Sequence, residues 1–126
     1  MSLLLDTHVL LWLLGGERRR FGPDALEALS DSVAIVSAAT VWEIAIKRRL
    51  GKLQAPPNLI DTVATAGLQL LSITAAHAEH VADLPDLHRD PFDRILVAQA
   101  ALEKLTIVTA DENIRRYEIL AMDPAA

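Results

Sequence analysis

Several acidic side chains of this sequence stand where some of them together could hold a divalent metal ion: Asp6, Glu43, Asp90, Asp93 and Asp111. If they converge, their like charges raise one another's pKa values, and a divalent cation relieves that repulsion. A set of ligands that are all oxygens favours Mg²⁺ or Mn²⁺. Such an ion lowers the pKa of a bound water molecule and stabilises negative charge on phosphoryl oxygens. The chemistry that these residues suggest is therefore hydrolysis of a phosphodiester bond.

The chain lacks the residues that several other catalytic chemistries require. The sequence contains no cysteine, which excludes disulfides, thiolate metal sites and a thiol nucleophile. It has no Gly-x-Ser-x-Gly turn for a nucleophilic serine, and Gly15-Gly16 lacks the spacing of a phosphate-binding loop. His77 and His80 have the i, i+3 spacing of a helical metal pair, but no third ligand follows nearby. We interpret both histidines as solvated or packing side chains.

Each aspartate also has a simpler interpretation in the start of a helix. Asp6 and Asp111 each follow a short apolar run and could accept hydrogen bonds from the first N–H groups of the next helix. Asp90 precedes Pro91, which suits the first helical position, so Asp90 is predicted to be an N-cap. Asp93 would lie in the first turn of that helix, where the helix dipole favours an anion.

Glu43 is harder to explain in this way. Thr40-x-x-Glu43 matches a capping box, but Ser37 directly follows an apolar run and is the better N-cap. Glu43 is flanked by Val41-Trp42 and by Ile44-Ala45-Ile46. A carboxylate buried in such a setting needs a partner or a metal ion to stay ionised. Glu43 therefore favours a functional site over simple capping.

Short apolar runs alternate with helical segments along the whole chain. We expect strands at residues 3–5, 33–36, 70–73 and 106–109, and a further edge strand at 118–121. Helices are expected at residues 7–14, 23–29, 38–50, 59–66, 75–84, 91–104 and 114–116, with a charged loop at 17–20. Uniformly apolar strands that alternate with helices predict an α/β fold. Its central parallel sheet would have four or five strands, with helices on both faces.

This fold would bring the acidic residues together. In an open parallel sheet, binding sites form outside the carboxyl ends of the strands. Asp6 ends the first strand, Asp111 follows the fourth, and the helix that contains Asp93 starts from the same edge. Capping is the better explanation for Asp6 or Asp111 taken alone, whereas the joint pattern favours a metal site.

The composition narrows the class of protein. The chain has 126 residues, and we expect residues 1–126 to form one domain with its own core. No apolar run is long enough to span a bilayer, and Asp6 and His8 interrupt the apolar N-terminal run, which is a poor signal peptide. We therefore expect a cytoplasmic protein. A formal net charge of −5 argues against a protein that coats nucleic acid, but not against an enzyme that handles it locally.

Four segments together resemble the PIN-domain ribonucleases, and specifically the VapC-type toxins of bacterial toxin–antitoxin pairs. The segments are Leu3-Leu4-Leu5-Asp6-Thr7-His8, residues 37–47 around Trp42-Glu43-Ile44, residues 88–100 with Asp90-Pro91-Phe92-Asp93-Arg94, and Ile107-Val108-Thr109-Ala110-Asp111. They occur in the order and spacing of the family, and the resemblance extends over nearly the whole chain. It implies a PIN-like three-layer α/β/α sandwich.

The resemblance also implies a metal-dependent endoribonuclease with Mg²⁺ or Mn²⁺ as its cofactor. The acidic quartet of the family falls on Asp6, Glu43, Asp93 and Asp111. Asp6 would be the central metal ligand, and Asp93 and Asp111 would complete the site directly or through water. Glu43 would bind the metal or position the attacking water, and Thr109 resembles the family's hydroxyl residue near the metal.

Further residues are expected to support the metal site or to contact RNA: Asp90, Arg94, Thr7 and Ser37. Asp90 is expected chiefly as the helix cap. Arg94 could contact a phosphate or form a salt bridge with a nearby acid. For His8 and His88, which flank the acidic residues, we expect local hydrogen bonds.

Three basic patches could bind the phosphates of RNA: Arg18-Arg19-Arg20, Lys47-Arg48-Arg49 with Lys52, and Arg115-Arg116. Each could equally be ordinary solvated surface. A nuclease of net negative charge needs a local positive field, so we expect at least one patch to guide RNA.

The resemblance implies three partners: an RNA substrate, a cognate antitoxin protein and a second copy of the chain in a homodimer. The antitoxin of this family typically covers the acidic pocket and keeps the toxin inactive. The segment Val9–Leu14, which includes Trp12, has little polar face, so it is either buried or part of such an interface.

Two other classes of function remain open. A phospho-acceptor signalling domain is also a small α/β fold with clustered acids, but it needs adjacent acids after its first strand and a lysine after its last. Here Asp6 has no acidic neighbour, and Val108 leads to Asp111. A non-catalytic α/β module that binds protein is the other alternative, although a scaffold gains nothing from four crowded carboxylates.

Overall fold

A sheet of five parallel strands forms the centre of the computed structural model, which describes residues 1–126. The strands are β1 (Ser2–Leu5), β2 (Val33–Ser37), β3 (Gln69–Leu71), β4 (Thr106–Val108) and β5 (Ala121–Met122). Their order in the sheet is β3-β2-β1-β4-β5. The central strand β1 pairs with β2, Leu3 opposite Ala34, and with β4, Leu4 opposite Ile107. The predicted parallel sheet is confirmed.

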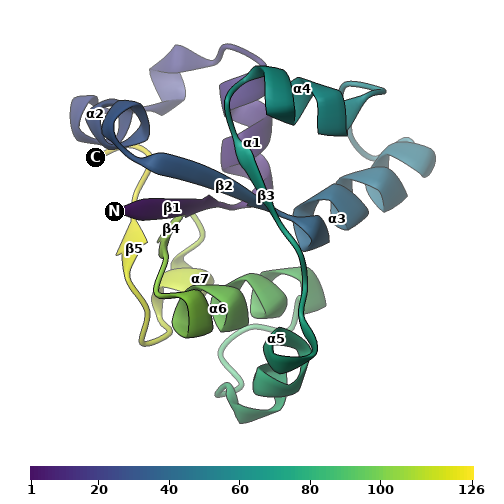
Figure 1. Ribbon diagram of the computed structural model, residues 1–126, viewed down its shortest axis with the longest axis vertical. Coiled ribbons are helices and arrows are strands. Elements are labelled where there is room, and N and C mark those ends of the chain that lie inside the picture. Colours follow the sequence, from purple (N-terminus) through teal and green to yellow (C-terminus); the bar gives the residue numbers. More distant parts are fainter.

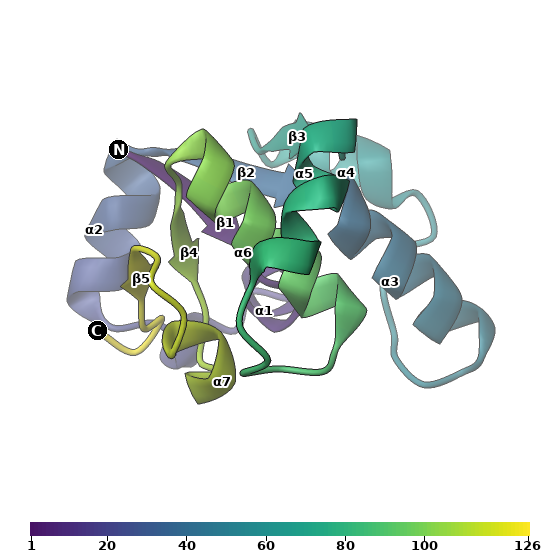
Figure 2. The ribbon, with the colours of Figure 1, turned by 90° about the horizontal axis from the view of Figure 1, so that it is seen from below.

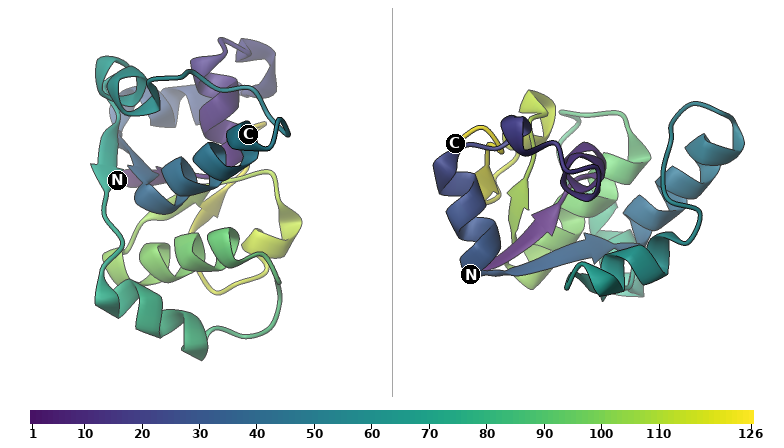
Figure 3. Two further views of the ribbon diagram at one scale, coloured as in Figure 1. Left: turned by 90° about the vertical axis from the view of Figure 1, so that its right-hand side faces the viewer. Right: turned by 90° about the horizontal axis from the view of Figure 1, so that it is seen from above.

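Seven α-helices and two 3₁₀ helices connect and cover the strands. They are α1 (Thr7–Leu14), η1 (Arg18–Arg20), α2 (Pro23–Asp31), α3 (Ala38–Arg49), α4 (Leu59–Thr65), α5 (Ala75–His80), η2 (Val81–Asp83), α6 (Pro91–Glu103) and α7 (Glu112–Arg115). Helices α1, α2 and α4 lie on one side of the sheet, and α5, α6 and α7 on the other (Figure 1). Helix α3 leaves the carboxyl end of β2 and lies beside α6 (Figure 3). The architecture is the expected three-layer α/β/α sandwich.

Two hydrophobic cores explain why β1 has three leucines in succession. Successive side chains of a strand point to opposite faces of its sheet. Leu3 and Leu5 belong to the core on the side of α1, and Leu4 belongs to the core on the side of α6. All three are fully buried. Figure 2 looks onto α5 and α6, which cover the sheet from that second side. None of the helices is long and apolar enough to span a bilayer.

The limits of the short elements differ from those expected. Strand β3 covers Gln69–Leu71 rather than 70–73, and β5 covers Ala121–Met122 rather than 118–121. Residues 18–20 form a 3₁₀ turn, and the helix expected to reach residue 84 divides into α5 and η2. An edge strand ends where its one partner ends. The register of β3 follows residues 35–37 of β2, and no local sequence pattern encodes that pairing.

Side-chain caps at the carboxyl ends of strands start three of the helices. The side chains of Asp6, Ser37 and Asp111 accept hydrogen bonds from the first turns of α1, α3 and α7. Ser37 rather than Thr40 begins α3, as expected, and its buried Oγ accepts from the Ala39 N–H at 3.0 Å. The cap by Asp111 makes α7 begin two residues before the turn that the sequence suggested. Capping thus fixes both aspartates at one edge of the sheet.

Candidate metal centre

The candidate site lies where the path of the chain through the sheet changes direction. From β1 the chain adds β2 and then β3 on one side, whereas β4 and β5 lie on the other side of β1. The connections that leave β1 and β4 therefore diverge, and α/β sheets bind ligands at such a switch point. Asp6 directly follows β1, and Thr109 and Asp111 follow β4.

A pocket of about 440 Å³ opens at this edge, and the predicted acidic quartet lines it. The lining residues are Asp6, Thr7, His8, Trp12, Glu43, Lys47, His88, Asp90, Asp93, Ala110 and Asp111. Thr109 is buried directly behind Asp6. Two residues that we expected near the metal or RNA do not line the pocket: Ser37, whose hydroxyl is the buried cap of α3, and Arg94.

Asp6 is buried and held from two sides. Its Oδ1 accepts a hydrogen bond from the Val9 N–H at 2.8 Å, which is the cap of α1. Its Oδ2 accepts from the hydroxyl of Thr109. Burial raises the pKa of Asp6, and the bond from Thr109 opposes that rise. Because Thr109 Oγ1 also accepts from the Asp111 N–H at 3.0 Å, this hydroxyl links Asp6, the first member of the acidic quartet, to Asp111, the last.

Glu43 is buried in α3 and finds its partners within the protein. The hydroxyl of Thr7 donates to Oε1, and Lys47 Nζ donates to Oε2 at 2.6 Å. The bond to Glu43 raises the pKa of Lys47, which therefore stays charged. Sequence analysis placed Lys47 in a surface patch, whereas it lines the acidic pocket. The i, i+4 spacing of Glu43 and Lys47 on one helix was the signal for this pair.

His88 joins the two remaining carboxylates, a position that the sequence analysis did not assign to it. Its Nε2 lies 2.9 Å from Asp93 Oδ2 and 3.1 Å from Asp111 Oδ2. Its Nδ1 accepts from the backbone N–H of Asp90 at 3.2 Å, so the ring proton is on Nε2 and is donated to the carboxylates. The bond from the Asp90 N–H is the local hydrogen bond that we expected for His88. The other ring nitrogen, Nε2, contacts two of the candidate metal ligands.

The donor atoms present fit a divalent cation. One carboxylate oxygen each from Asp93 and Asp111 lie within 4.8 Å of each other and of a ring nitrogen of His88, which a cation at this place would replace as their partner. Burial raises the pKa of Asp93 to about 7, and the charges of Asp90, Glu43 and Asp111 add to the rise, while His88 opposes it. Repulsion between carboxylates, which the sequence suggested as the main cause, is therefore secondary to burial. A cation would compensate both effects, and hard oxygen donors suit Mg²⁺ or Mn²⁺.

Asp90 has the scaffold position that the sequence predicted. Its Oδ1 accepts from the N–H groups of Phe92 at 2.8 Å and Asp93 at 3.2 Å, and Pro91 opens α6. The carboxylate also lines the acidic pocket, and its charge raises the pKa of Asp93. Asp90 thus starts α6 and adds negative charge beside a candidate ligand.

Arg94 holds the segment before α6 and does not line the acidic pocket, and its one link to a lining residue is a long bond to the backbone carbonyl oxygen of His88 at 3.4 Å. Its guanidinium donates to the carbonyl oxygens of Val81 at 2.9 Å and Pro85 at 3.0 Å, and to Tyr117 Oη at 3.2 Å. The only carboxylate within 4.0 Å belongs to the fully exposed Asp86, at 3.9 Å. The expected phosphate contact does not fit this geometry, because these acceptors already use the guanidinium.

Replacing Arg94 by methionine should lower the free energy of unfolding by about 2 to 4 kcal/mol, because the carbonyl oxygens of Val81 and Pro85 and the hydroxyl of Tyr117 lose a shared charged donor. Thermal unfolding measures this loss. The matched control is Arg89→Met, an exposed residue nearby that should change stability by less than about 0.5 kcal/mol. If Arg94→Met keeps its stability but binds RNA more weakly, the result would support a phosphate contact by Arg94 instead.

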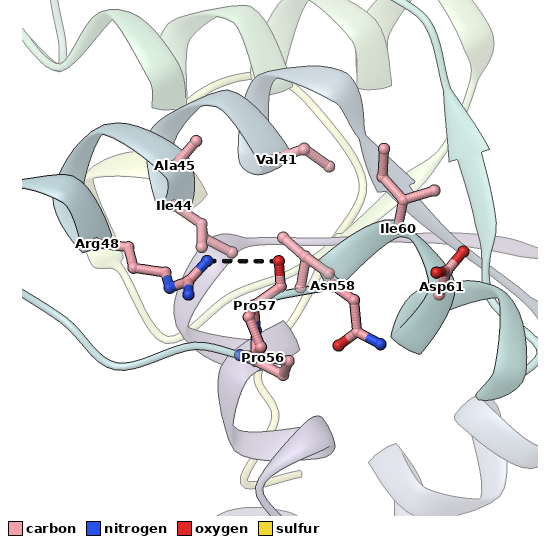
Figure 4. A pocket seen from close by; sticks show the side chains of 10 residues that line it. Val41, Ile44, Ala45, Arg48, Pro56, Pro57, Asn58, Ile60 and Asp61 are labelled. Atoms are coloured by element: carbon pink, nitrogen blue, oxygen red, sulfur yellow. Dashed lines mark hydrogen bonds between the residues drawn. The ribbon is translucent and has the colours of Figure 1, made fainter.

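A second hollow lies on another face of α3 (Figure 4). Apolar side chains of α3, among them Val41 and Ile44, face Pro56, Pro57 and the start of α4 across it. Arg48 Nη1 donates to the carbonyl oxygen of Pro57 at 3.4 Å and ties the two walls together. None of the acidic quartet lines this hollow, so it is distinct from the candidate metal centre.

The sequence matches the family model of the PIN domain over residues 3–120. Because the match covers most of the chain, the chain belongs to the PIN-domain family. PIN domains are generally nucleases, and the family is in general metal-dependent. Membership of this family leaves no support for the phospho-acceptor alternative.

Solved structures of toxin–antitoxin complexes contain chains with the same fold. A chain of VapBC2 from Rickettsia felis, bound to a promoter DNA fragment, has a TM-score of 0.73 at 13% identity, covering 97% of this chain and 98% of that one. A chain of a toxin–antitoxin complex from Klebsiella pneumoniae has a TM-score of 0.68 at 21% identity, covering 98% of both chains. A chain of DNA-bound VapBC from Salmonella typhimurium has a TM-score of 0.68 at 19% identity, covering 98% of both chains. A comparison with curated protein sequences finds no match.

Proposed function

We propose that this chain is a VapC-type toxin, an endoribonuclease that hydrolyses RNA phosphodiester bonds with the help of Mg²⁺ or Mn²⁺. The observation that carries the proposal is the convergence of Asp6, Glu43, Asp93 and Asp111 in one pocket at the switch point of a PIN-family fold. Capping accounts for Asp6 and Asp111 singly, but the repulsion and burial of four carboxylates in one pocket cost stability, and a bound cation would offset that cost.

The residues of the pocket would have different roles in the reaction. When bound, a divalent ion supplies a water molecule of lowered pKa and stabilises charge on the phosphoryl oxygens. Asp6, Asp93 and Asp111 would hold it. Glu43 would orient the attacking water, because its carboxylate oxygens keep free lone pairs beside their bonds to Thr7 and Lys47.

Two further side chains would keep the ligands in place. Thr109 fixes one oxygen of Asp6 through its hydroxyl. His88 holds Asp93 and Asp111 through its single Nε2 proton. Hydrogen bonds of this kind orient metal ligands, and their loss typically lowers metal affinity or activity by about 10- to 100-fold. Lys47 would place one positive charge beside the phosphate being cleaved.

The proposal includes the partners that such a toxin needs. The support for a cognate antitoxin is that the three structurally similar chains belong to toxin–antitoxin complexes. The exposed apolar side chains of Trp42 on α3, Leu50 at its C-cap and Ile60 on α4 offer surface for an antitoxin or a second copy of the chain. The substrate would be RNA of the cytoplasm.

Incubation of the purified protein with RNA tests the reaction directly. We expect fragments to accumulate with Mg²⁺ or Mn²⁺, to be absent with a chelator, and to return when excess metal is added, because the carboxylates alone offer no nucleophile. Cleavage that persists in the chelator would overturn the metal mechanism. Intact RNA with either metal would instead favour the non-catalytic binding module.

A further inference from the structure

Trp12 connects the acidic pocket to the arginine segment of η1. Its side chain lines the acidic pocket together with Asp6, His8 and Asp111. It also lines an adjoining hollow with Gly16, Glu17 and Arg18. A molecule that extends out of the acidic pocket past Trp12 therefore reaches the arginine segment next.

The surroundings of the Trp12 ring are aromatic and cationic. The guanidinium carbon of Arg20 lies 4.7 Å from the ring centroid, a cation–π contact. The His8 ring, one turn earlier in α1, has its centroid 6.2 Å away. Trp12 is half-buried, whereas His8, Arg18, Arg19 and Arg20 are exposed. A rigid ring that lines the pocket, with one arginine over the ring and two more exposed nearby, suits a ligand that is both aromatic and anionic.

We propose that single-stranded RNA leaves the acidic pocket along this surface, with one unpaired base stacked on Trp12 and its neighbouring phosphates bound by Arg18 and Arg20. The inference rests on the proposed function, and it names the path and the form of the substrate. Aromatic side chains beside a positive groove bind single strands in this way, because every base has a face that can stack. The bases of a duplex are already stacked on one another, so paired RNA cannot use Trp12.

The other basic patches are less suited to this task. Lys47 is paired with Glu43 at 2.6 Å, and Arg48 donates to a backbone carbonyl oxygen. Arg115 lies 3.2 Å from Asp123 and 3.9 Å from Glu112. Arg20 has one exposed acidic neighbour, Glu17, at 3.5 Å, and such an exposed pair contributes little. Of the three patches, the arginines of η1 alone share a wall with the acidic pocket through an aromatic ring.

Tryptophan fluorescence tests the path without cleavage. The chain has two tryptophans, so Trp42→Phe leaves Trp12 as the only tryptophan and Trp12→Phe leaves Trp42. Both are made in an Asp6→Asn background and titrated, with Mg²⁺, with random-sequence single-stranded RNA of about ten nucleotides. We expect saturable quenching in the protein with Trp12 alone, none in the protein with Trp42 alone, and none with duplex RNA of equal length.

Affinity measurements extend the test to the named side chains. Trp12→Ala should weaken binding by about 5- to 150-fold, the loss typical of one stacked base. Arg20→Gln should reduce the slope of log affinity against log salt by about 0.7, the value for one phosphate contact with a single strand. The matched control is Lys104→Gln, an exposed residue at the C-terminal end of α6 that belongs to none of the three basic patches and should leave the slope unchanged.

The outcomes separate this inference from the proposed function. Binding without quenching of Trp12, equal affinity of Trp12→Ala, or no binding at all would overturn the path. Wild-type protein that quenches on binding but does not cleave with metal would overturn the nuclease and leave the path standing. If Trp12→Ala does not fold, the pair of phenylalanine variants decides, because phenylalanine preserves the packing of α1 against the core.

Discussion

Replacing Asp6 by asparagine is expected to reduce metal-dependent RNA cleavage by roughly 10³-fold or more. The carboxylate sits at the carboxyl end of the central strand, between β4 and the start of α1, and contributes a charge that an amide cannot replace. Metal affinity should fall with activity, and titration calorimetry with Mn²⁺ measures it independently of any RNA.

The same substitution should leave the fold intact. Asparagine still caps a helix, so the bond from the Val9 N–H survives, and the hydroxyl of Thr109 can rotate to suit the amide. Burial already raises the pKa of Asp6, so a neutral side chain fits its surroundings better than the charge does. Melting temperature should therefore stay level or rise. Asp24→Asn, at the exposed start of α2, is the control for activity, and wild-type cleavage by Asp6→Asn would refute the assignment.

Without metal, the stability of the protein should fall as pH rises from about 4 to 7, because of Asp93. Its pKa is 3.8 when unperturbed and about 7 in the folded protein. The folded state therefore binds more protons than the unfolded state between these values. The stability that this provides is fully present below pH 3.8 and is lost as pH rises through 7. The free energy of unfolding should fall by roughly 2 to 4 kcal/mol over this range. The figure is set below the full energy equivalent of the pKa shift because 18% of the Asp93 side chain is exposed.

Thermal unfolding in a chelator measures this effect as the difference between wild type and Asp93→Asn across the same pH range. The variant should lack most of the dependence, which separates Asp93 from other titrating groups. Addition of Mg²⁺ at pH 7.5 should restore the stability of the wild type, because the ion binds the folded state and compensates the carboxylates, and should do much less at pH 5. Parallel pH profiles for the two proteins would show that Asp93 is not the group responsible.

Much of the site was predictable because strand ends and helix starts coincide there. Asp6 and Asp111 follow apolar runs, and Asp93 follows a clear capping signal, so a parallel sheet places all three at one edge. The parts that were missed depend on tertiary geometry. His88 lies in an irregular segment, and no periodic pattern indicates that its ring reaches both Asp93 and Asp111.

For Arg94, sequence analysis suggested a contact that the structure does not favour. A positive charge one residue after a candidate ligand suggested a phosphate contact, but successive residues of a helix point in different directions. The guanidinium is instead directed to the carbonyl oxygens of Val81 and Pro85. Those acceptors are available only because the chain between α5 and α6 folds back beside this helix, a path that composition and spacing do not encode.

The bond between Thr109 and Asp6 joins residues 103 positions apart, across the neighbouring strands β4 and β1. During synthesis, β1 and its first neighbour β2 emerge long before β4, the strand that completes the pairing of β1 on its other side. Asp6 and Glu43 are present long before Thr109 and Asp111, yet the two halves of the site meet only when β4 inserts beside β1. An incomplete chain therefore has no assembled cation site. The proposed nuclease is inert while it is being made, beside the ribosomal and messenger RNA that surrounds it.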